Sequence, residues 1–520
     1  MRTSLVTSWS AVGAVLFSML VASSGACVGD EPGVVATGDG GLPGVEGGPL
    51  PIPPLPDGGL PPEQLPPGCD GAKDPKDEGC LITDQVGVFV STTTGDDARD
   101  GTKPSPVRTI ARGVERARAT GKRRVYVCEG DYPEPIVLDA LSDGIQLYGG
   151  LDCGAFTYTG ARPRVEPPSE GFALRIQGYT AATTVQDFDL AARDAVAVGA
   201  SSIGVFVDNV KEITFKRVKV FAGRGLTAGG EMNAPPTNHP AASLNGNGSA
   251  GGQAVCVDDT RSKGGNGGNS PGPTGMPGTA VPPTSGPGGE GGADDQNDVC
   301  ALVHQGKPGA NGAAQTGGTS AATHGTLHAS GWEPATSNRG AAGRPGQGGG
   351  GGGYNSDQGI DGSGGGAGSC GGAGGLGGRG GGASIAVASL NSSARFIDSE
   401  LLTSQAGDGG RGGTGEAARP GGTAGGAGCA GGVGGRGASG SGGGGGPGGL
   451  SAGIVWRLGV APSWDGSLVE DIAALPNVSL GLGGGGGPGG EGGLPNGAVK
   501  GLTGSTGMPG AKKAVHKVAN

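Results

Sequence analysis

Two aspartates in alternate positions are the strongest candidates for chemistry in this sequence. Asp187 and Asp189 fall on one face of an expected strand from Thr184 to Leu190, so their carboxylates would project the same way. Paired carboxylates can bind calcium or share the acid and base steps of glycoside cleavage. Arg175 and Asp208 lie on neighbouring expected strands and could complete a site in a groove. The competing interpretation, which we favour, is four solvated side chains on the outside of the fold.

Other patterns with catalytic or metal-binding spacing are weaker. His324 and His328, in HGTLH, are four residues apart, but no glutamate lies between them and no amphipathic helix surrounds them. The absence of any CxxC pair disfavours zinc. The GGxGG runs lack the regular aspartates of calcium-binding nonapeptide repeats, and no serine has a recognisable histidine and aspartate partner. The residues therefore predict no catalytic centre, no metal site and no cofactor, with calcium at the aspartate pair as the alternative.

The first 26 residues have the features of a secretory signal. Arg2 precedes an apolar run from Ala11 to Ala22, and small residues lead up to Cys27. The ending SSGAC resembles the lipobox of bacterial lipoproteins, which implies that Cys27 becomes a lipidated N-terminal residue. Simple cleavage after Ala26 is the alternative. Because Val28 rather than aspartate follows, the resemblance implies an outer-membrane lipoprotein, or else an extracellular protein, of a Gram-negative bacterium.

The remaining cysteines predict disulfides. Nine cysteines minus Cys27 leave eight, and an even number in an exported chain indicates bridges. Sequential pairing is the simplest of many connectivities. It would join Cys69 to Cys80, Cys128 to Cys153, Cys256 to Cys300 and Cys370 to Cys429.

The composition limits how large a hydrophobic core the chain can form. The chain of 520 residues contains 123 glycines and 38 prolines, a content typical of low-complexity sequence. Aromatic residues make up 4% and the net charge is -10, which argues against a nucleic-acid partner. Residues 27–68 read as a Gly/Pro-rich tether.

Strand, helix and turn signals follow one another most densely between Gly87 and Gly150. A helix is expected after Thr109, with an apolar stripe at i, i+4 and i+7 and Gly121 as its C-terminal cap. A helix this short must pack against something. The stripe consists of Ile110, Val114 and Ala117, and the flanking strands are expected at Val88–Val90, Val125–Cys128, Ile136–Leu138 and Ile145–Tyr148.

The order of TGDDARDGT, SPVRTI, RVYVCEGDY and IQLYGG in this stretch resembles the opening of a family of bacterial pectin-lyase-like domains of unknown function. The resemblance implies a right-handed parallel β-helix whose N-terminal helix covers the open end. Gly113 departs from the alanine usual on that helix face, which weakens the helix by about 1 kcal/mol. Polysaccharide lyases and hydrolases share this fold, but the hydrolase signatures Asn-Thr-Asp and Gly-His-Gly do not occur here.

An internal repeat supports a solenoid. Residues 201–225 match residues 383–407 in spacing, and a third copy begins at Ser451 and ends near Val478. Every copy leads straight into glycine, so the repeat unit is a coil and the glycine-rich stretches are inserts. Inserts that leave the same corner would stack along one side of the solenoid. Their order stays open, because glycine buries no apolar surface but allows close backbone layers.

The predicted organisation is therefore all-β, a right-handed parallel β-helix with one capping helix and long glycine-rich loops. The predicted function is binding or structural at the cell surface, toward polysaccharide, with a lipid anchor in the membrane. The alternatives are a polysaccharide lyase or glycoside hydrolase acting in the β-helix groove, and a passive surface coat. The predicted boundaries are signal 1–26, tether 27–68, β-helix 69–222, 383–406 and 451–482, and glycine-rich segments 223–382, 407–450 and 483–520.

Overall fold

The computed structural model describes residues 62–519 except 231–243, 259, 280–286, 297–298, 427, 496 and 498. The predicted signal peptide, Cys27 and most of the predicted tether lie outside the described residues. All described residues belong to one compact unit, Pro51–Asn520. Among them, no helix is both long enough and apolar enough to cross a bilayer.

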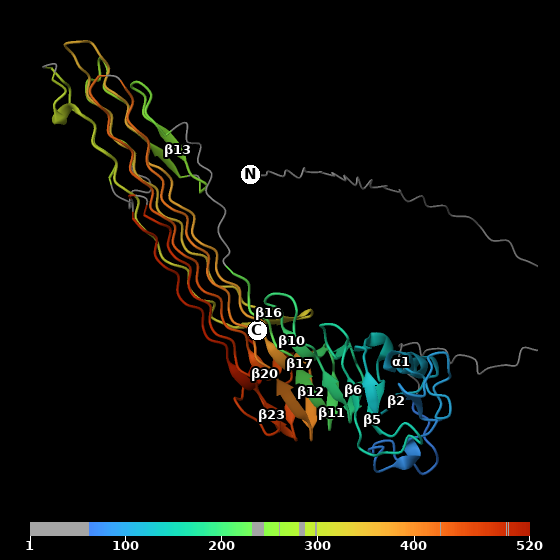
Figure 1. Cartoon of the computed structure of the whole chain (residues 1–520). Helices are drawn as coiled ribbons and strands as arrows, with labels where there is room; N and C mark the ends of the chain where they lie inside the picture. Colours follow the sequence, from blue (N-terminus) through green and yellow to red (C-terminus); the bar gives the residue numbers. More distant parts are fainter. Residues whose placement is uncertain are drawn as a thin grey trace, which may run out of the picture. The chain divides into compact units, whose positions relative to one another are not determined.

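Three sheets of mainly parallel strands form a right-handed β-helix, as predicted (Figure 1). The chain winds from one sheet to the next, so each full coil adds one strand to each sheet. The first sheet contains β1 (Gly87–Val90), β2 (Arg124–Cys128), β5 (Gln146–Leu151), β8 (Ala182–Gln186), β11 (Glu212–Lys216), β18 (Ala394–Ile397), β21 (Ser463–Trp464) and β22 (Ser467–Leu468). The second contains β4 (Ile136–Leu138), β7 (Leu174–Gln177), β10 (Ser202–Asp208), β17 (Ser384–Ser392), β20 (Ser451–Gly459) and β24 (Lys512–Lys517). The third contains β3 (Gly130–Tyr132), β6 (Pro163–Val165), β9 (Asp189–Ala191), β12 (Lys219–Ala222), β19 (Glu400–Thr403) and β23 (Val478–Ser479).

Alternate side chains of these strands fill the interior. One row stacks through three coils, with 5.2 Å between the ring centroids of Phe215 and Phe396 and 5.6 Å between those of Phe396 and Trp464. The helix α1 (Ile110–Ala119) packs its buried stripe on β1, β2 and β4. The predicted helix is therefore confirmed, with Thr109 accepting a hydrogen bond from the Arg112 amide as its N-cap. The described residues also form three short 3-10 helices: η1 (Gly79–Leu81), η2 (Ala140–Ser142) and η5 (Leu302–His304).

Left-handed residues turn the chain at a stacked corner. Gly178 and Asn209 follow β7 and β10, and Asn391 and Leu458 are the penultimate residues of β17 and β20. All four have positive φ angles. Asparagine and glycine tolerate this conformation. Asn391 Nδ2 also donates to Asn209 Oδ1 at 2.7 Å, which links two successive coils at the turn.

The repeated segments are adjacent coils. Ser202 pairs with Ser384, and Lys219 pairs with Glu400. The third copy follows, because β17 pairs in register with β20. Matching spacing in the sequence thus corresponds to matching register in the sheets.

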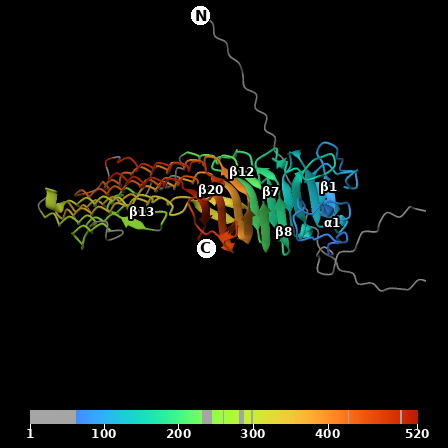
Figure 2. The same cartoon turned by 90° about the horizontal axis from the view of Figure 1, so that it is seen from below.

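The three glycine-rich inserts leave the solenoid at one corner. They begin after β12, β19 and β23, which are neighbours in the third sheet. They return at β17, β20 and β24, which are neighbours in the second sheet. The inserts therefore stack, and their segments run side by side in both views (Figures 1 and 2).

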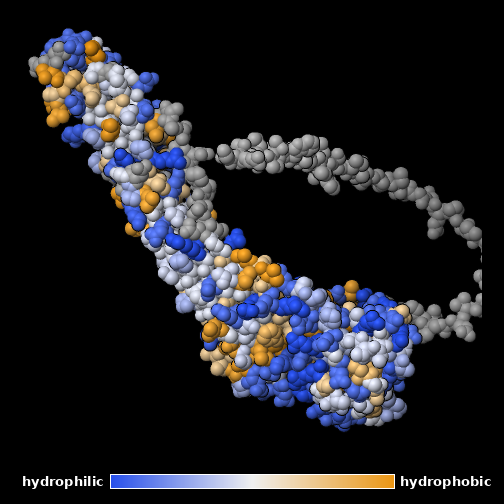
Figure 3. Space-filling model, viewed as in Figure 1, coloured by the Kyte–Doolittle hydropathy of each residue, from blue (hydrophilic) through white to orange (hydrophobic). Residues whose placement is uncertain are grey.

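The described segments of the inserts form a regular hydrogen-bonded array. Gly372, Gly375 and Gly378 donate in turn to the carbonyls of Ala438, Ser441 and Gly444 at 2.8–2.9 Å. A donor every third residue, bonded between segments rather than within one, fits the three-residue turn of a polyproline II helix. We call the array of such segments the glycine bundle; its described residues lie within 244–320, 335–382, 404–450 and 480–511. Its surface is mostly pale, of intermediate hydropathy, in Figure 3.

The bundle requires glycine because its backbones lie too close together to leave room for side chains. A Cβ placed on Gly443 would lie 1.9 Å from the carbonyl oxygen of Leu376, and most bundle glycines show similar contacts. Only a residue without a side chain lets backbones approach this closely.

Two predicted disulfides are present and two are wrong. Cys69–Cys80 and Cys128–Cys153 occur as expected. In place of the pairs Cys256–Cys300 and Cys370–Cys429, the structure has Cys256–Cys370 and Cys300–Cys429. Segments of the bundle run back and forth, so its spatial neighbours are distant in sequence. Cys256 directly follows β13 (Gln253–Val255), which forms a hairpin with β14 (Arg261–Lys263).

Candidate functional site

Part of the outer face of the first sheet, around β2, is covered by the N-terminal segment 62–86. Glu63 forms an ion pair of 2.6 Å with Arg124, whose guanidinium also donates to the Gly71 carbonyl at 2.8 Å. The Tyr126 hydroxyl donates to the Leu81 carbonyl at 2.5 Å. These contacts fix the segment over β2 and leave no open surface there.

Asp187 belongs to this covered face and does not share a strand with Asp189. The expected strand is divided between β8 and β9, and Asp187 occupies the corner between them with φ +57°. Its carboxylate is 2% exposed and accepts two hydrogen bonds from Arg217, of 2.7 and 2.8 Å. The prediction that the two aspartates form a pair on one face is therefore wrong. A left-handed corner residue breaks the alternation of side chains.

A buried cluster that the sequence did not predict joins Asp187 to the N-terminal segment. Asp74 forms ion pairs of 2.8 Å with Arg217 and 3.0 Å with Lys216, and Gln186 donates to it at 2.7 Å. Burial alone would raise the pKa of Asp74, but these hydrogen bonds and one from the Lys76 amide lower it to about 2. Residues 74 and 217 are distant in sequence, and no local signal connects them.

Arg175 and Asp208 come together on the second sheet, as predicted for neighbouring coils. β7 pairs with β10, and the Arg175 guanidinium lies over the Phe172 and Phe206 rings. Asp208 is 0% exposed, and burial raises the pKa of its carboxyl while Arg175 acts in the opposite direction. Asp208 Oδ2 has no hydrogen-bond partner among the described residues. Asp208 is therefore enclosed and not open to a large substrate, whereas Arg175 is partly exposed.

The cover over this face is a hairpin of β15 (Gly325–His328) and β16 (Gly331–Pro334), which we call the strap. Leu327 and Trp332 of the strap pack in one buried cluster with Phe206 and Ile203 of β10. This hairpin was not predicted from the sequence, because it lies inside the first glycine-rich insert.

The strap also explains the two predicted histidines. His328 is the last residue of β15, and its Nε2 lies 3.4 Å from Glu333 on the same hairpin. His324 precedes the strand and hydrogen-bonds the Gly448 carbonyl at 3.2 Å. Their spacing of four residues is not that of one helical face, since the segment between them is a strand.

The outer face of the third sheet carries an alternating row of charges. The row crosses five strands and includes Asp189, which also forms an ion pair of 3.4 Å with Arg162. Lys219 and Glu400 form another, of 3.3 Å. Opposite charges on adjacent strands fix the register of the coils. In order, the row is Asp131, Arg164, Asp189, Lys219 and Glu400.

Two hollows lie along the corner where the third sheet turns into the second. One, of about 490 Å³, contains Phe221 and Val196, whose side chains are 37% and 74% exposed. The next, of about 410 Å³, shares Asp194 with the first. Ion pairs line both, because Glu166 lies 3.4 Å from Arg193 and Asp194 lies 3.1 Å from Arg224. We call the two hollows together the corner groove.

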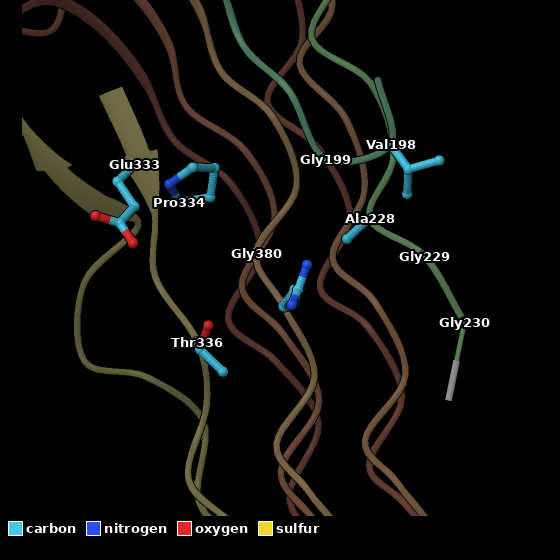
Figure 4. Close-up of a pocket in the computed structure, with 10 residues that line it drawn as sticks. Val198, Gly199, Ala228, Gly229, Gly230, Glu333, Pro334, Thr336 and Gly380 are labelled. Atoms are coloured by element: carbon cyan, nitrogen blue, oxygen red, sulfur yellow. The ribbon is translucent and has the colours of Figure 1, made fainter. Parts of the chain in front are cut away.

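A third hollow, of about 570 Å³, lies where the glycine bundle meets the strap. Val198 and Ala228 line one side and Glu333 and Pro334 the other (Figure 4). Val198 follows the corner groove residue Val196 by two positions in the same turn. The open surface of the solenoid thus combines apolar side chains with charges of both signs.

Two groups of described residues have the spacing of metal ligands. One is Cys69, Glu78 and Cys80, and the other is Asp295, Cys300 and Cys429. In both groups the sulfur atoms belong to disulfides. A disulfide sulfur is not the thiolate that binds zinc, so neither group offers a metal centre in this form.

Comparisons with known proteins extend to part of the solenoid. No family model and no curated protein matches the chain. Among solved structures, the GH136 lacto-N-biosidase of Eubacterium ramulus is similar over 26% of this chain and 27% of that one, with 17% identity and a TM-score of 0.20. The catalytic domain of a GH87 alpha-1,3-glucanase, in complex with tetrasaccharides, is similar over 32% and 28%, with 14% identity and a TM-score of 0.17. The similar region thus spans about a quarter of the length of each enzyme chain. The substrates of the two enzymes are known for those enzymes and are not assigned to this chain.

Proposed function

We propose that this protein binds an extended polysaccharide in the corner groove and does not cleave it. The observation that carries the proposal is the pair of adjoining hollows along the solenoid, with an exposed phenylalanine ring beside bonded charge pairs. Sugars present apolar C–H faces to aromatic rings and hydroxyls to charged or polar groups. A groove that spans successive coils suits a ligand with repeating units.

The charge pairs in the groove suit hydroxyl ligands. Arg193 and Arg224 are each held by a carboxylate from the preceding coil. Side chains fixed in this way lose little conformational entropy when a ligand binds. Arginine donors and carboxylate acceptors together match hydroxyl groups, which both donate and accept.

The candidate catalytic aspartates are poorly arranged for glycoside cleavage. Glycoside hydrolysis needs two carboxyl groups facing one bond, with one of them available as an acid. Asp187 is held by Arg217 under the N-terminal segment, Asp189 is paired with Arg162, and Asp208 is enclosed below the strap. A passive surface coat would require no groove at all.

The disulfides are those of an extracytoplasmic protein. We further propose that Cys27 carries a lipid and that the chain between Cys27 and the docked segment 62–86 forms a tether to the outer membrane. Radiolabelled palmitate incorporation into the full chain, and its loss in Cys27→Ala, tests the anchor independently of sugar binding.

Affinity electrophoresis of the exported chain through gels containing single polysaccharides tests the binding. We expect retardation by at least one polymer, and a loss of about tenfold in affinity in Phe221→Ala. Val137→Ala is the matched control, because Val137 is an exposed apolar residue on the second sheet. New reducing or unsaturated ends in the polymer would establish a lyase or hydrolase instead. No retardation by any polymer would favour the coat.

A further inference from the structure

Every described arginine that lines the corner groove is already bonded to a carboxylate of this chain. One oxygen of Glu166 accepts two hydrogen bonds from Arg164, of 2.8 and 3.2 Å. The other oxygen of Glu166 lies 3.4 Å from the Arg193 guanidinium. Asp194 lies 3.1 Å from the Arg224 guanidinium and also accepts a hydrogen bond from the Arg224 amide at 2.6 Å. The groove therefore presents its arginines only as members of ion pairs.

Carboxylates outnumber arginines in the groove by four to three. The two carboxylates without an arginine partner accept hydrogen bonds from the backbone. Glu170 accepts one from the Val196 amide at 2.9 Å, and Asp408 accepts one from the Gly485 amide at 2.5 Å. A polyanion would thus meet a groove of its own sign on a chain with a net charge of -10.

We propose that the corner groove selects uncharged polysaccharides, and that Glu166 and Asp194 exclude acidic polymers by holding the arginines. The inference rests on the proposed function and names the class of polymer that the groove accepts. A carboxylate or sulfate of a ligand could bind an arginine only by displacing a carboxylate of the protein. That carboxylate would lose its partner, which disfavours the acidic ligand.

An uncharged sugar can bind without breaking these pairs. A hydroxyl group donates one hydrogen bond and accepts others, so it can bridge the carboxylate and the guanidinium of an intact pair. Arg193 and Arg224 each lie two residues after a strand, β9 and β12, of successive coils. The exposed side chains of Phe221 and Val196 line the same groove. Sugar units of an uncharged polymer can therefore meet one ion pair per coil and place their apolar faces on the phenylalanine ring.

Binding of matched neutral and anionic polymers to the full exported chain tests this selection. The probes are dextran with dextran sulfate, hydroxyethyl cellulose with carboxymethyl cellulose, and methyl-esterified galacturonan with free galacturonan. Titration calorimetry at low ionic strength, where charges are least screened, measures the affinity for both members of each pair. We expect at least one neutral polymer to bind, and its anionic partner to bind at least tenfold more weakly.

Glu166→Gln should shift this preference toward the anionic polymer. Glutamine keeps the length of the side chain and one acceptor oxygen, but it removes the charge that pairs with Arg164 and Arg193. We expect the affinity for the anionic polymer, relative to its neutral partner, to rise at least tenfold. The gain should disappear at about 0.5 M salt, where the interaction of exposed charges is screened. Asp194→Asn releases Arg224 and provides an independent test if Glu166→Gln does not fold.

Glu212→Gln is the matched control. Glu212 lies 3.3 Å from Arg395 on the first sheet, outside the groove. Its side chain is 39% exposed and that of Glu166 is 33% exposed, so both substitutions remove one charge from a similar ion pair. Glu212→Gln should keep the wild-type ratio of the two affinities, and an equal shift in all three variants would overturn the inference.

The remaining outcomes separate this inference from the function on which it rests. If the wild-type chain binds an anionic polymer as tightly as its neutral partner, and Phe221→Ala weakens both, the groove binds polysaccharide but does not select by charge. An unchanged ratio in both Glu166→Gln and Asp194→Asn would also overturn the selection. If none of the polymers binds, the proposed function fails and this inference fails with it.

Discussion

At a single position, a close packing contact can outweigh the local preference of the sequence, and Gly113 is an example. Gly113 lies in the middle of α1, where alanine would favour the helix by about 1 kcal/mol. A Cβ at this position would lie 2.5 Å from Val90 Cγ2 and 3.0 Å from Val125 Cγ1. Both contacts are with branched side chains buried in the first sheet, which cannot move away easily. The glycine therefore sets how closely α1 covers the end of the solenoid.

We expect Gly113→Ala to destabilise the protein by about 1–3 kcal/mol despite the better helix propensity, because overpacking outweighs that gain. Urea unfolding followed by circular dichroism measures the change. Gly79→Ala is the control, because a Cβ there would meet no atom within 4 Å, and its stability should be unchanged. A stabilised Gly113→Ala would show that α1 can shift outward without loss.

The Asp74 cluster predicts a specific acid sensitivity. The pKa of Asp74 is about 2 in the folded protein and 3.8 ordinarily. Its ion pairs therefore contribute about 2 kcal/mol above pH 4, and this contribution is lost as the pH falls from about 4 to 2. In Asp74→Asn, unfolding free energies should be lower at pH 7 and should fall less steeply below pH 4. The exposed Asp77→Asn, three residues away, should keep the wild-type slope.

At the scale of elements, the helix and strands that depend on neighbouring residues could be predicted from the sequence, whereas elements that depend on distant contacts could not. The cap and stripe of α1 and the short strands of the coils are visible in the sequence, because each depends on neighbouring residues. The strap and the pairs Cys256–Cys370 and Cys300–Cys429 are not, since they depend on which bundle segments become neighbours. The same limit applies to the site. Arg175 and Asp208 were predicted together from adjacent coils, whereas Asp74 and Arg217 could not be.

Composition alone did not decide whether the glycine-rich segments, which form the glycine bundle, would be ordered. Glycine content predicts disorder when chains are considered singly, but here each backbone is hydrogen-bonded to several others. The disulfide Cys256–Cys370 also links segments far apart in sequence. The sequence did contain one signal of this order. Its GGX spacing matches a hydrogen-bond donor at every third residue.

We expect Gly443→Ala to disrupt the bundle locally, because its Cβ would lie 1.9 Å from the Leu376 carbonyl oxygen. Hydrogen exchange of peptides from 362–382 and 430–450 should accelerate at least tenfold, while peptides from β1 and β2 stay protected. Gly426→Ala is the matched control, since no atom lies within 4 Å of that Cβ. Unchanged exchange in Gly443→Ala would mean that the segments are not packed backbone against backbone.

At the scale of the whole molecule, the solenoid and the glycine bundle differ in what they depend on. Each coil is held by its own apolar side chains and by its neighbours above and below. The bundle segments have no such core and depend for their hydrogen bonds on other segments of the same insert or of another insert. Gly410, of the second insert, bonds Arg379 of the first, and Gly487, of the third, bonds Gly446 of the second.

This difference predicts unequal results when inserts are removed. The turn 192–201 makes the same crossing from β9 to β10 without an insert, so a turn of that length can join β12 to β17, β19 to β20 and β23 to β24. We expect a chain with all three inserts replaced in this way to keep a cooperative thermal transition and β-rich circular dichroism. A chain lacking only the first insert should be worse, because segments of the second and third would lose their partners and expose unpaired backbone groups. Proteolysis of the remaining glycine-rich segments would report that loss, and an intact bundle without the first insert would show that each insert folds alone.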